Sequence, residues 1–332
     1  MEYKLTTPKM DEIITALSEN NVIYAPKALN DGGVRYGEIS SASEIVFDQK
    51  SDFSPKETIY PVVQTALYFA DGACTESSPI DKNIIVFVRS CDIHAFERLD
   101  TIFLKNGEQE DNLYARLREK VKFFLIECAG FENCFCVTLS TNKTSNYSVA
   151  LKNTPEGYLV QVKDSDFKEL FASFPATTFA PEFVSENKKA VELPHITSDR
   201  ISTIHGLEFW HEHTKDCTSC GSCNMVCGTC SCFDTIDIIY SETSRSGERR
   251  RIWAGCMQTK FDVMAGGHSV RDNPGDRMRF KVMHKIHDFK TRFGSDVMCV
   301  GCGRCEDRCP EEISFIEAIK ALKDELKKGG AS

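Results

Sequence analysis

Eight cysteines of this 332-residue chain fall into two runs of identical spacing, C-x2-C-x2-C-x3-C. The first run is Cys217, Cys220, Cys223 and Cys227, and the second is Cys299, Cys302, Cys305 and Cys309. A [4Fe–4S] cluster needs thiolates on adjacent corners, and two-residue spacers let one short turn supply three of them. The spacing therefore predicts two [4Fe–4S] clusters. Zinc, which also binds paired CxxC motifs, is the alternative.

The second run, with Pro310 after its last cysteine, has the full pattern of bacterial two-cluster ferredoxins. In those proteins the fourth cysteine of each run ligates the other cluster. By this resemblance, the ligands of cluster 1 would be Cys217, Cys220, Cys223 and Cys309. Those of cluster 2 would be Cys299, Cys302, Cys305 and Cys227. We expect Gly221, Gly301 and Gly303 to let the backbone approach the clusters and donate N–H groups to their sulfur atoms.

A third group of cysteines is predicted from the elements that carry them. Two apolar runs of strand length, 83–88 and 122–127, are each followed by a cysteine, and residues 92–104 between them have helical apolar spacing. Parallel strands joined in this way end at one edge of a sheet, which would bring Cys91 and Cys128 together. The next loop adds Cys134 and Cys136. We predict a third [4Fe–4S] cluster on these four thiols; buried structural thiols or a zinc site are the alternatives.

The remaining cysteines carry no such pattern. For Cys74, Cys230, Cys232 and Cys256 a structural role is favoured; metal binding by three of these thiols together with a histidine such as His268 is the alternative. Cys128 and Cys134 also match the C-x5-C of sirohaem proteins, but the required C-x3-C pairs already belong to the two runs, so we treat the match as chance. Walker loops, GxGxxG fingerprints, HExxH motifs and Ser-His-Asp signatures are absent from the sequence. We therefore expect no FAD, NAD or sirohaem in this chain, and other subunits must deliver and remove its electrons.

Composition and charge limit the partners and the cellular compartment that this chain could have. The net charge of −9 argues against nucleic-acid binding. Basic residues gather at 249–251 and 277–292, which are interpreted as solvated faces, with docking of an acidic partner as the alternative. No apolar run approaches the ~20 residues of a membrane span, and the N-terminus lacks a signal peptide. We expect a cytoplasmic protein, in which reduced thiols serve as metal ligands rather than as disulfides.

The periodicity predicts two domains. Residues 1–180 are expected to form an α/β (α+β) domain that carries the third cluster, and the proline-containing segment 175–187 leads out of it. Residues 181–332 are expected to form a mainly α-helical ferredoxin-like domain with the two clusters. Its helices are predicted at 276–293 and 313–328, where apolar residues recur at helical spacing.

Several sequence blocks together resemble a known family. They are RSCDIHAFERLD, IECAGFENCFCV, CTSCGSCNMVCGTCSCFD, GERRRIWAGCM, MAGGHSVRDNPGDRMRFKVMHK and CVGCGRCEDRCP. In this order, and over nearly the whole chain, they are similar to the iron–sulfur electron-transfer subunits of anaerobic sulfite reductases, which are related to sulfhydrogenase beta subunits. One difference is Gly228, which stands where the family usually has proline.

This resemblance implies a protein that is not catalytic alone. It would take electrons from a flavin subunit that oxidises NADH, and it would pass them through [4Fe–4S] clusters to a sirohaem subunit that reduces sulfite to sulfide. The alternative is the beta subunit of a cytoplasmic nickel–iron sulfhydrogenase.

Overall fold

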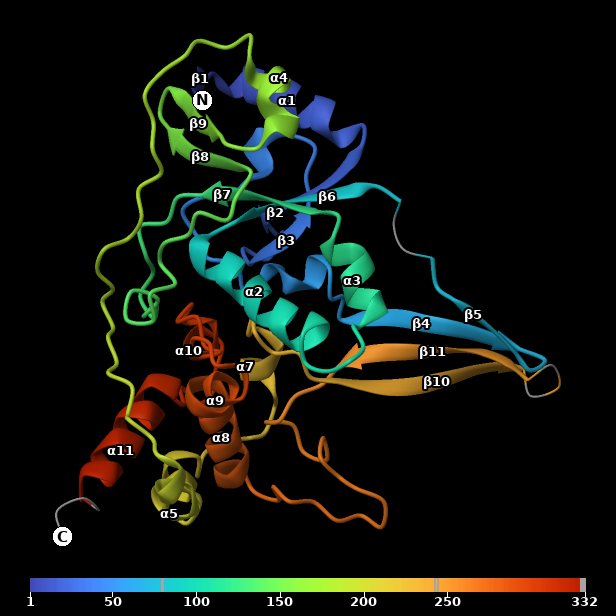
Figure 1. Cartoon of the computed structure of the whole chain (residues 1–332), viewed down its shortest axis with the longest axis vertical. Helices are drawn as coiled ribbons and strands as arrows, with labels where there is room; N and C mark the ends of the chain where they lie inside the picture. The colour runs from blue at the N-terminus through green and yellow to red at the C-terminus, as the bar shows by residue number, and fades with distance from the viewer. Residues whose placement is uncertain (79–80, 242, 244, 329–332) are drawn as a thin grey trace.

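A computed structural model describes residues 1–78, 81–241, 243 and 245–328. It contains a large mixed sheet, a projecting β-arm and a group of helices at the C-terminal end (Figure 1). The large sheet has the order β1-β9-β8-β7-β6-β2-β3. Its strands are β1 (Glu2–Leu5), β2 (Asn21–Ala28), β3 (Val34–Glu38), β6 (Asn83–Val88), β7 (Val121–Ile126), β8 (Val149–Thr154) and β9 (Gly157–Val162).

Helices cover both faces of this sheet. On one face, α1 (Thr7–Ser18) and α4 (Lys168–Phe171) contribute to an apolar core with the sheet. On the other face, α2 (Ser90–Leu104) and α3 (Asn112–Arg118) pack against a second core. Short 3₁₀ turns complete the connections: η1 (Ala42–Glu44), η2 (Pro55–Thr58), η3 (Ser165–Phe167) and η4 (Ser198–Arg200). The mixture of helices and strands predicted for the N-terminal part is confirmed.

The centre of the sheet is parallel. β2 pairs with β6, β6 with β7, and β7 with β8, all in parallel. Because both faces are covered, β6 and β7 are almost continuously apolar and buried, which explains their uninterrupted hydrophobic sequences. Cys91 follows β6 in the first turn of α2, and Cys128 follows β7. The predicted strand–helix–strand unit is therefore present.

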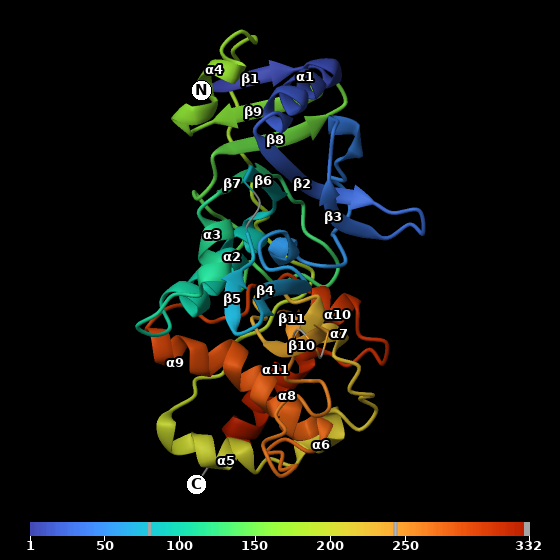
Figure 2. The same ribbon diagram turned by 90° about the vertical axis from the view of Figure 1, so that its right-hand side faces the viewer.

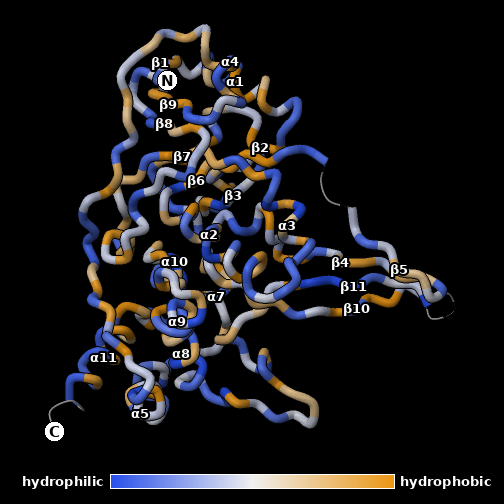
Figure 3. The backbone as a smooth tube through the Cα atoms, in the orientation of Figure 1, coloured by the Kyte–Doolittle hydropathy of each residue, from blue (hydrophilic) through white to orange (hydrophobic). Residues whose placement is uncertain are grey.

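The β-arm is a four-stranded antiparallel sheet that projects from the body of the molecule (Figure 1) and points toward the viewer in Figure 2. Its strands, in the order β10-β11-β4-β5, are β4 (Val63–Ala70), β5 (Ala73–Glu76), β10 (Phe233–Ser241) and β11 (Ser246–Trp253). The arm combines two strands that precede residue 180 with two that follow it. The domain boundary at 180/181 stays a prediction. Apolar side chains such as Tyr68, Ile239 and Tyr240 are exposed on it, and apolar segments are visible along its strands (Figure 3).

The C-terminal half differs from the mainly helical domain that we expected. Its helices are α5 (Ile201–His205), α6 (Phe209–His213), α7 (Ser222–Met225), α8 (Pro274–Met283), α9 (Phe289–Phe293), α10 (Arg304–Asp307) and α11 (Phe315–Lys328). Two long strands, β10 and β11, also lie here because β11 pairs with β4 of the N-terminal half. Residues 254–273 form turns without helix or strand. None of the helices in the described ranges is long and apolar enough to cross a membrane.

The two helices predicted in this half are present. The segment 276–293 becomes α8, a π-helical turn η5 (His284–Asp288) and α9, which follow one another without a break. α11 buries Phe315, Ile319 and Leu322 against the C-terminal core, as its apolar spacing predicted.

Candidate iron–sulfur centres

The four residues predicted to ligate cluster 1 line one cavity. Cys217, Cys220, Cys223 and Cys309 surround about 470 Å³ of empty volume, part of it open to solvent. Cys217 lies within electrostatic range of the other three thiols. The structure thus places the last cysteine of the second run beside the first three cysteines of the first run.

The set predicted for cluster 2 is also brought together, and it is more deeply enclosed. Cys305 lies within electrostatic range of Cys227, Cys299 and Cys302. Cys302 is buried, and Cys299 and Cys227 are half-buried. Cys227 is therefore separated from the first three cysteines of its own run and faces the second run. That each set ligates a cluster stays a prediction.

Two glycines of the second run admit a loop from the N-terminal half. Gly301 and Gly303 have φ angles of +63° and +72°, which favour glycine. A Cβ atom on Gly303 would lie 2.3 Å from the carbonyl oxygen of Asn133, and one on Gly301 would lie 2.7 Å from the backbone nitrogen of Cys136. The Phe135 N–H donates to the Gly301 carbonyl at 2.8 Å. We expected these glycines to approach a cluster; the structure shows that they also make room for the 133–136 loop.

The third predicted set of cysteines therefore adjoins the set predicted for cluster 2. Cys136 lies within electrostatic range of Cys134, Cys128 and Cys302, and Cys91 within range of Cys302 and Cys136. The Cys134 thiol donates to the Cys302 carbonyl at 3.4 Å. The topology of the sheet supplies Cys91 and Cys128, as predicted, and the contact with Cys302 is a feature that the sequence did not reveal.

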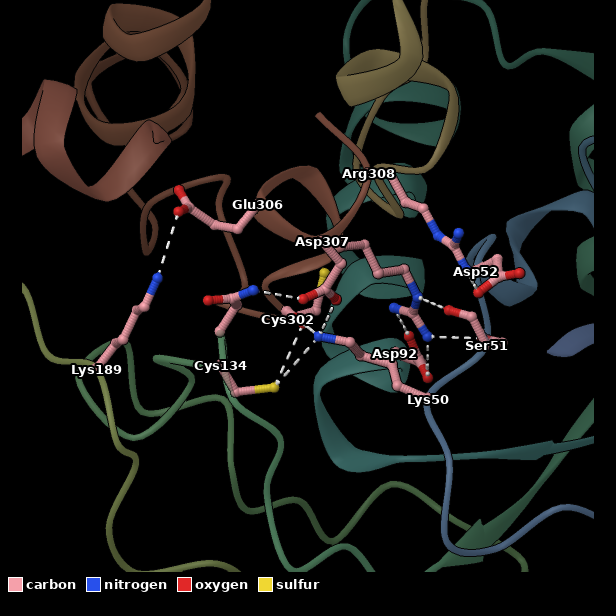
Figure 4. Close-up of polar contacts among 12 residues, drawn as sticks. Lys50, Ser51, Asp52, Asp92, Cys134, Lys189, Cys302, Glu306, Asp307 and Arg308 are labelled. Carbon is pink, nitrogen blue, oxygen red and sulfur yellow. Dashed lines mark hydrogen bonds and ion pairs between the residues drawn. The ribbon is translucent and has the colours of Figure 1, made fainter. Parts of the chain in front are cut away.

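A polar network fixes this junction (Figure 4). Arg304, beside Cys305, forms a 2.7 Å ion pair with Asp92, beside Cys91, and both side chains are at most 2% exposed. Arg304 also donates to the carbonyl and hydroxyl oxygens of Ser51, both at 3.0 Å. The junction between the N-terminal half and the second run is thus held by buried charged groups.

Lys50 of the N-terminal half also contacts residues of this junction. Its ammonium donates to the Cys302 carbonyl at 2.9 Å, lies 3.8 Å from the Cys134 sulfur and pairs with Asp307 at 2.5 Å (Figure 4). A positive charge at this position would stabilise negative charge on the thiolates of either set.

Three basic residues of 277–292 are buried, which corrects the interpretation of this segment as a solvated face for its first part, whereas Lys290 and Arg292 are exposed. Arg277, Lys281 and Lys285 are at most 5% exposed. Lys281 hydrogen-bonds Cys223 and lies within electrostatic range of Cys305, whereas Lys285 acts on Cys227 and Cys299. Cationic side chains are buried here because thiols from both runs face α8 and η5. The basic residues of 249–251 are ion-paired instead, with Asp237, Glu248 and Asp111 as partners.

Burial dominates the acidity of the enclosed thiols. It raises the pKa of Cys299 to about 12 and that of Cys136 to about 12. Cys227 is an exception: burial raises its pKa, but the Lys285 and Lys56 ammonium groups and a hydrogen bond with Thr229 together lower it by more. Iron must displace the protons of such thiols, so the ligand sets suit a metal that binds thiolate strongly.

The donor sets fit [4Fe–4S] clusters in number, chemistry and enclosure. Each predicted set offers four thiols on turns, and cationic side chains lie beside them to offset their charge. Over the described ranges, no group of three or more His, Cys, Asp or Glu side chains is close enough together to hold a single metal ion.

Comparison with known proteins supports [4Fe–4S] clusters in the C-terminal half. Residues 216–313 match the family described as 4Fe-4S dicluster domain. Over 98% of its length, the chain is 28% identical to the whole of sulfhydrogenase 2 subunit beta from Pyrococcus furiosus. No solved structure matches the chain.

These findings define the chain as an iron–sulfur electron-transfer protein. More narrowly, it carries a 4Fe-4S dicluster domain and is related over nearly its whole length to a sulfhydrogenase beta subunit. The specificity for sulfite reduction that the sequence resemblance implied has no support from these comparisons.

Proposed function

We propose that this chain is the beta-type electron-transfer subunit of a sulfhydrogenase-like complex, and that its redox partner is a nickel–iron hydrogenase subunit. The observation that carries the proposal is the continuous contact among three cysteine sets. The N-terminal set touches the Cys302 turn, and Lys281 lies between Cys305 of the cluster 2 set and Cys223 of the cluster 1 set. Adjacent centres of this kind suit one-electron transfer.

The proposed ligand sets are those predicted from the sequence. Cluster 1 takes Cys217, Cys220, Cys223 and Cys309; cluster 2 takes Cys299, Cys302, Cys305 and Cys227; cluster 3 takes Cys91, Cys128, Cys134 and Cys136. Their contacts order them as cluster 3, cluster 2 and cluster 1. The buried position of Cys302 makes cluster 2 the internal step of the relay.

The two ends of this relay reach the surface. Cys220 is exposed at the cluster 1 end. At the other end, Cys128 lines an open groove together with Phe47, Asp48 and Glu186. We propose that electrons enter and leave at these two ends, where partner subunits can approach.

Electron transfer within a sulfite reductase remains the second candidate, because the sequence blocks around the cysteines resemble that family. In that case the partners would be a sirohaem subunit together with a flavin subunit that oxidises NADH. The full-length sulfhydrogenase relative favours the first candidate.

The test is isolation of the tagged full-length chain with its partners, without exposure to air. We expect nickel in the complex, and we expect hydrogen gas to generate the EPR signals of reduced [4Fe–4S] clusters in this chain. Sirohaem in the complex, with clusters that sulfite oxidises and hydrogen does not reduce, would overturn the hydrogenase proposal in favour of the second candidate. Zinc in place of iron would overturn both.

A further inference from the structure

Three cysteines outside the proposed ligand sets come together beside α7. Cys230 and Cys256 are buried and Cys232 is half-buried. The side-chain nitrogen of Asn224 lies 3.8 Å from the Cys230 sulfur and 3.5 Å from the Cys256 sulfur, so it bridges the two. Cys230 and Cys232 hydrogen-bond each other through their sulfur atoms. A turn after α7 and a turn after β11 thus deliver three thiols to one interior region.

Two buried ammonium groups accompany these thiols. Lys56 is 3% exposed and donates to the Cys230 carbonyl at 2.9 Å. Lys285 is 5% exposed and donates to the carbonyl and hydroxyl oxygens of Thr229 at 3.1 and 2.7 Å. In the described part of the chain, neither ammonium forms an ion pair with a carboxylate. Buried cations without a counter-ion are costly, so this region favours a negatively charged occupant.

The backbone around the thiols is firmly held. The Tyr60 hydroxyl donates to the carbonyls of Ser231 and Cys232, both at 3.1 Å, and the Trp253 indole N–H donates to the Tyr60 carbonyl at 3.0 Å. The Lys56 ammonium lies 3.9 Å from the centre of the Trp253 ring. The cysteine turn is therefore preorganised rather than a loose surface loop.

A histidine of η5 is a candidate for the fourth donor. His284 lies within electrostatic range of Cys230 and belongs to the same π-helical turn as Lys285. π-helical turns inside helices occur frequently at functional sites. This turn presents an imidazole and an ammonium to the same region.

We propose that Cys230, Cys232 and Cys256 hold an additional iron–sulfur centre, with His284 as its fourth ligand. Each thiol releases its proton to solvent when it binds iron, and the ammonium groups of Lys56 and Lys285 offset the resulting negative charge. Cys230 lies within electrostatic range of Cys227, so the centre sits beside cluster 2. The site goes beyond the proposed relay, which does not use these thiols.

The test counts iron and acid-labile sulfide in the full-length chain, purified without air or reconstituted with ferrous iron and inorganic sulfide. The variant replaces all three cysteines, Cys230→Ala, Cys232→Ala and Cys256→Ala; Cys74→Ala, at an exposed cysteine of the β-arm, is the control. We expect the triple variant to lose about four irons with equal sulfide if the centre is a cubane, and to lose one EPR signal. The control should keep both. His284→Ala should shift the same signal.

Unchanged iron and sulfide in a folded triple variant would overturn the proposal. So would zinc in this site, or a disulfide that lowers the mass of the chain by the two hydrogens it releases. If the triple variant does not fold, the single variant Cys232→Ala decides: relative to the wild-type chain it should lose the iron of one centre and one EPR signal, and unchanged iron would overturn the proposal. An unchanged EPR spectrum in His284→Ala would overturn the assignment of the fourth ligand. None of these readouts needs a partner protein, so they are independent of the proposed function.

Discussion

Replacement of Lys281 by methionine should make both C-terminal clusters harder to reduce. The Lys281 ammonium hydrogen-bonds Cys223, a proposed ligand of cluster 1, and acts on Cys305, a proposed ligand of cluster 2. The residue is 4% exposed, so solvent screens its charge weakly. Reduction adds negative charge to a cluster, and a nearby cation stabilises the reduced form. Loss of this cation must therefore lower both midpoint potentials.

The magnitude follows from the charge and its surroundings. A unit charge ~7 Å from the centre of a cluster, with an effective dielectric constant of ~20, contributes about 2 kcal/mol. For a one-electron couple this corresponds to a fall of about 100 mV in midpoint potential. Methionine preserves much of the length and apolar volume of lysine, so the packing of α8 should change little.

An EPR-monitored redox titration of the full-length chain measures this effect. Lys281→Arg keeps the charge and should retain most of the potential. Lys320→Met removes a charge that is exposed on α11 and paired with Glu317, so it serves as the matched control. If Lys281→Met keeps its iron and both potentials stay at the wild-type values, the argument that this buried ammonium tunes the clusters is refuted.

Three further changes test the junction between the two halves. Asp92→Asn should cost about 3–5 kcal/mol of unfolding free energy in anaerobic urea titrations, because it leaves the buried Arg304 charge unpaired. The double change Asp92→Leu with Arg304→Met should recover much of this loss, and equal stability of the wild type, the single variant and the double variant would contradict the reasoning. Gly303→Ala should displace the 133–136 loop and lower the iron content by up to about four atoms, whereas Gly107→Ala, which has open space around it, should not; unchanged iron in both would argue against the tight contact. Cys302→Ser should stop electron transfer to the partner in turnover assays while the chain still assembles, and full turnover would exclude an obligatory relay through cluster 2.

The sequence predicted the parts of the fold that local patterns determine. The apolar runs before Cys91 and Cys128 predicted buried strands, and the rules for parallel crossovers placed both cysteines at one edge of the sheet. The resemblance of the two runs to bacterial two-cluster ferredoxins predicted which cysteines would face each other. The strands and their edge follow from periodicity in a single sequence, whereas the crossed cysteine sets needed that resemblance.

Long-range pairing could not be predicted in the same way. β10 and β11 are neighbours in sequence and pair with each other, but the pairing of β11 with β4 joins segments about 180 residues apart in sequence. The mainly helical C-terminal domain was therefore the wrong expectation. The burial of Lys281 and Lys285 was also not predicted from the sequence. Both residues lie at helical spacing from the apolar residues Met278 and Val282, and this spacing could have predicted their burial.

The buried lysines connect the clusters to the stability of the fold. The net charge of −9 means that acidic residues outnumber basic ones in this chain. Even so, the described residues contain no carboxylate that forms an ion pair with Lys56, Lys281 or Lys285. Their neighbours are thiols instead, and a thiol that keeps its proton offers no charge to an ammonium. Iron binding converts these thiols to thiolates, which supplies the missing counter-charge at the positions where the ammonium groups are buried. Formation of the clusters should therefore complete the electrostatics of the C-terminal core, so that folding of this region and cluster assembly are one coupled process.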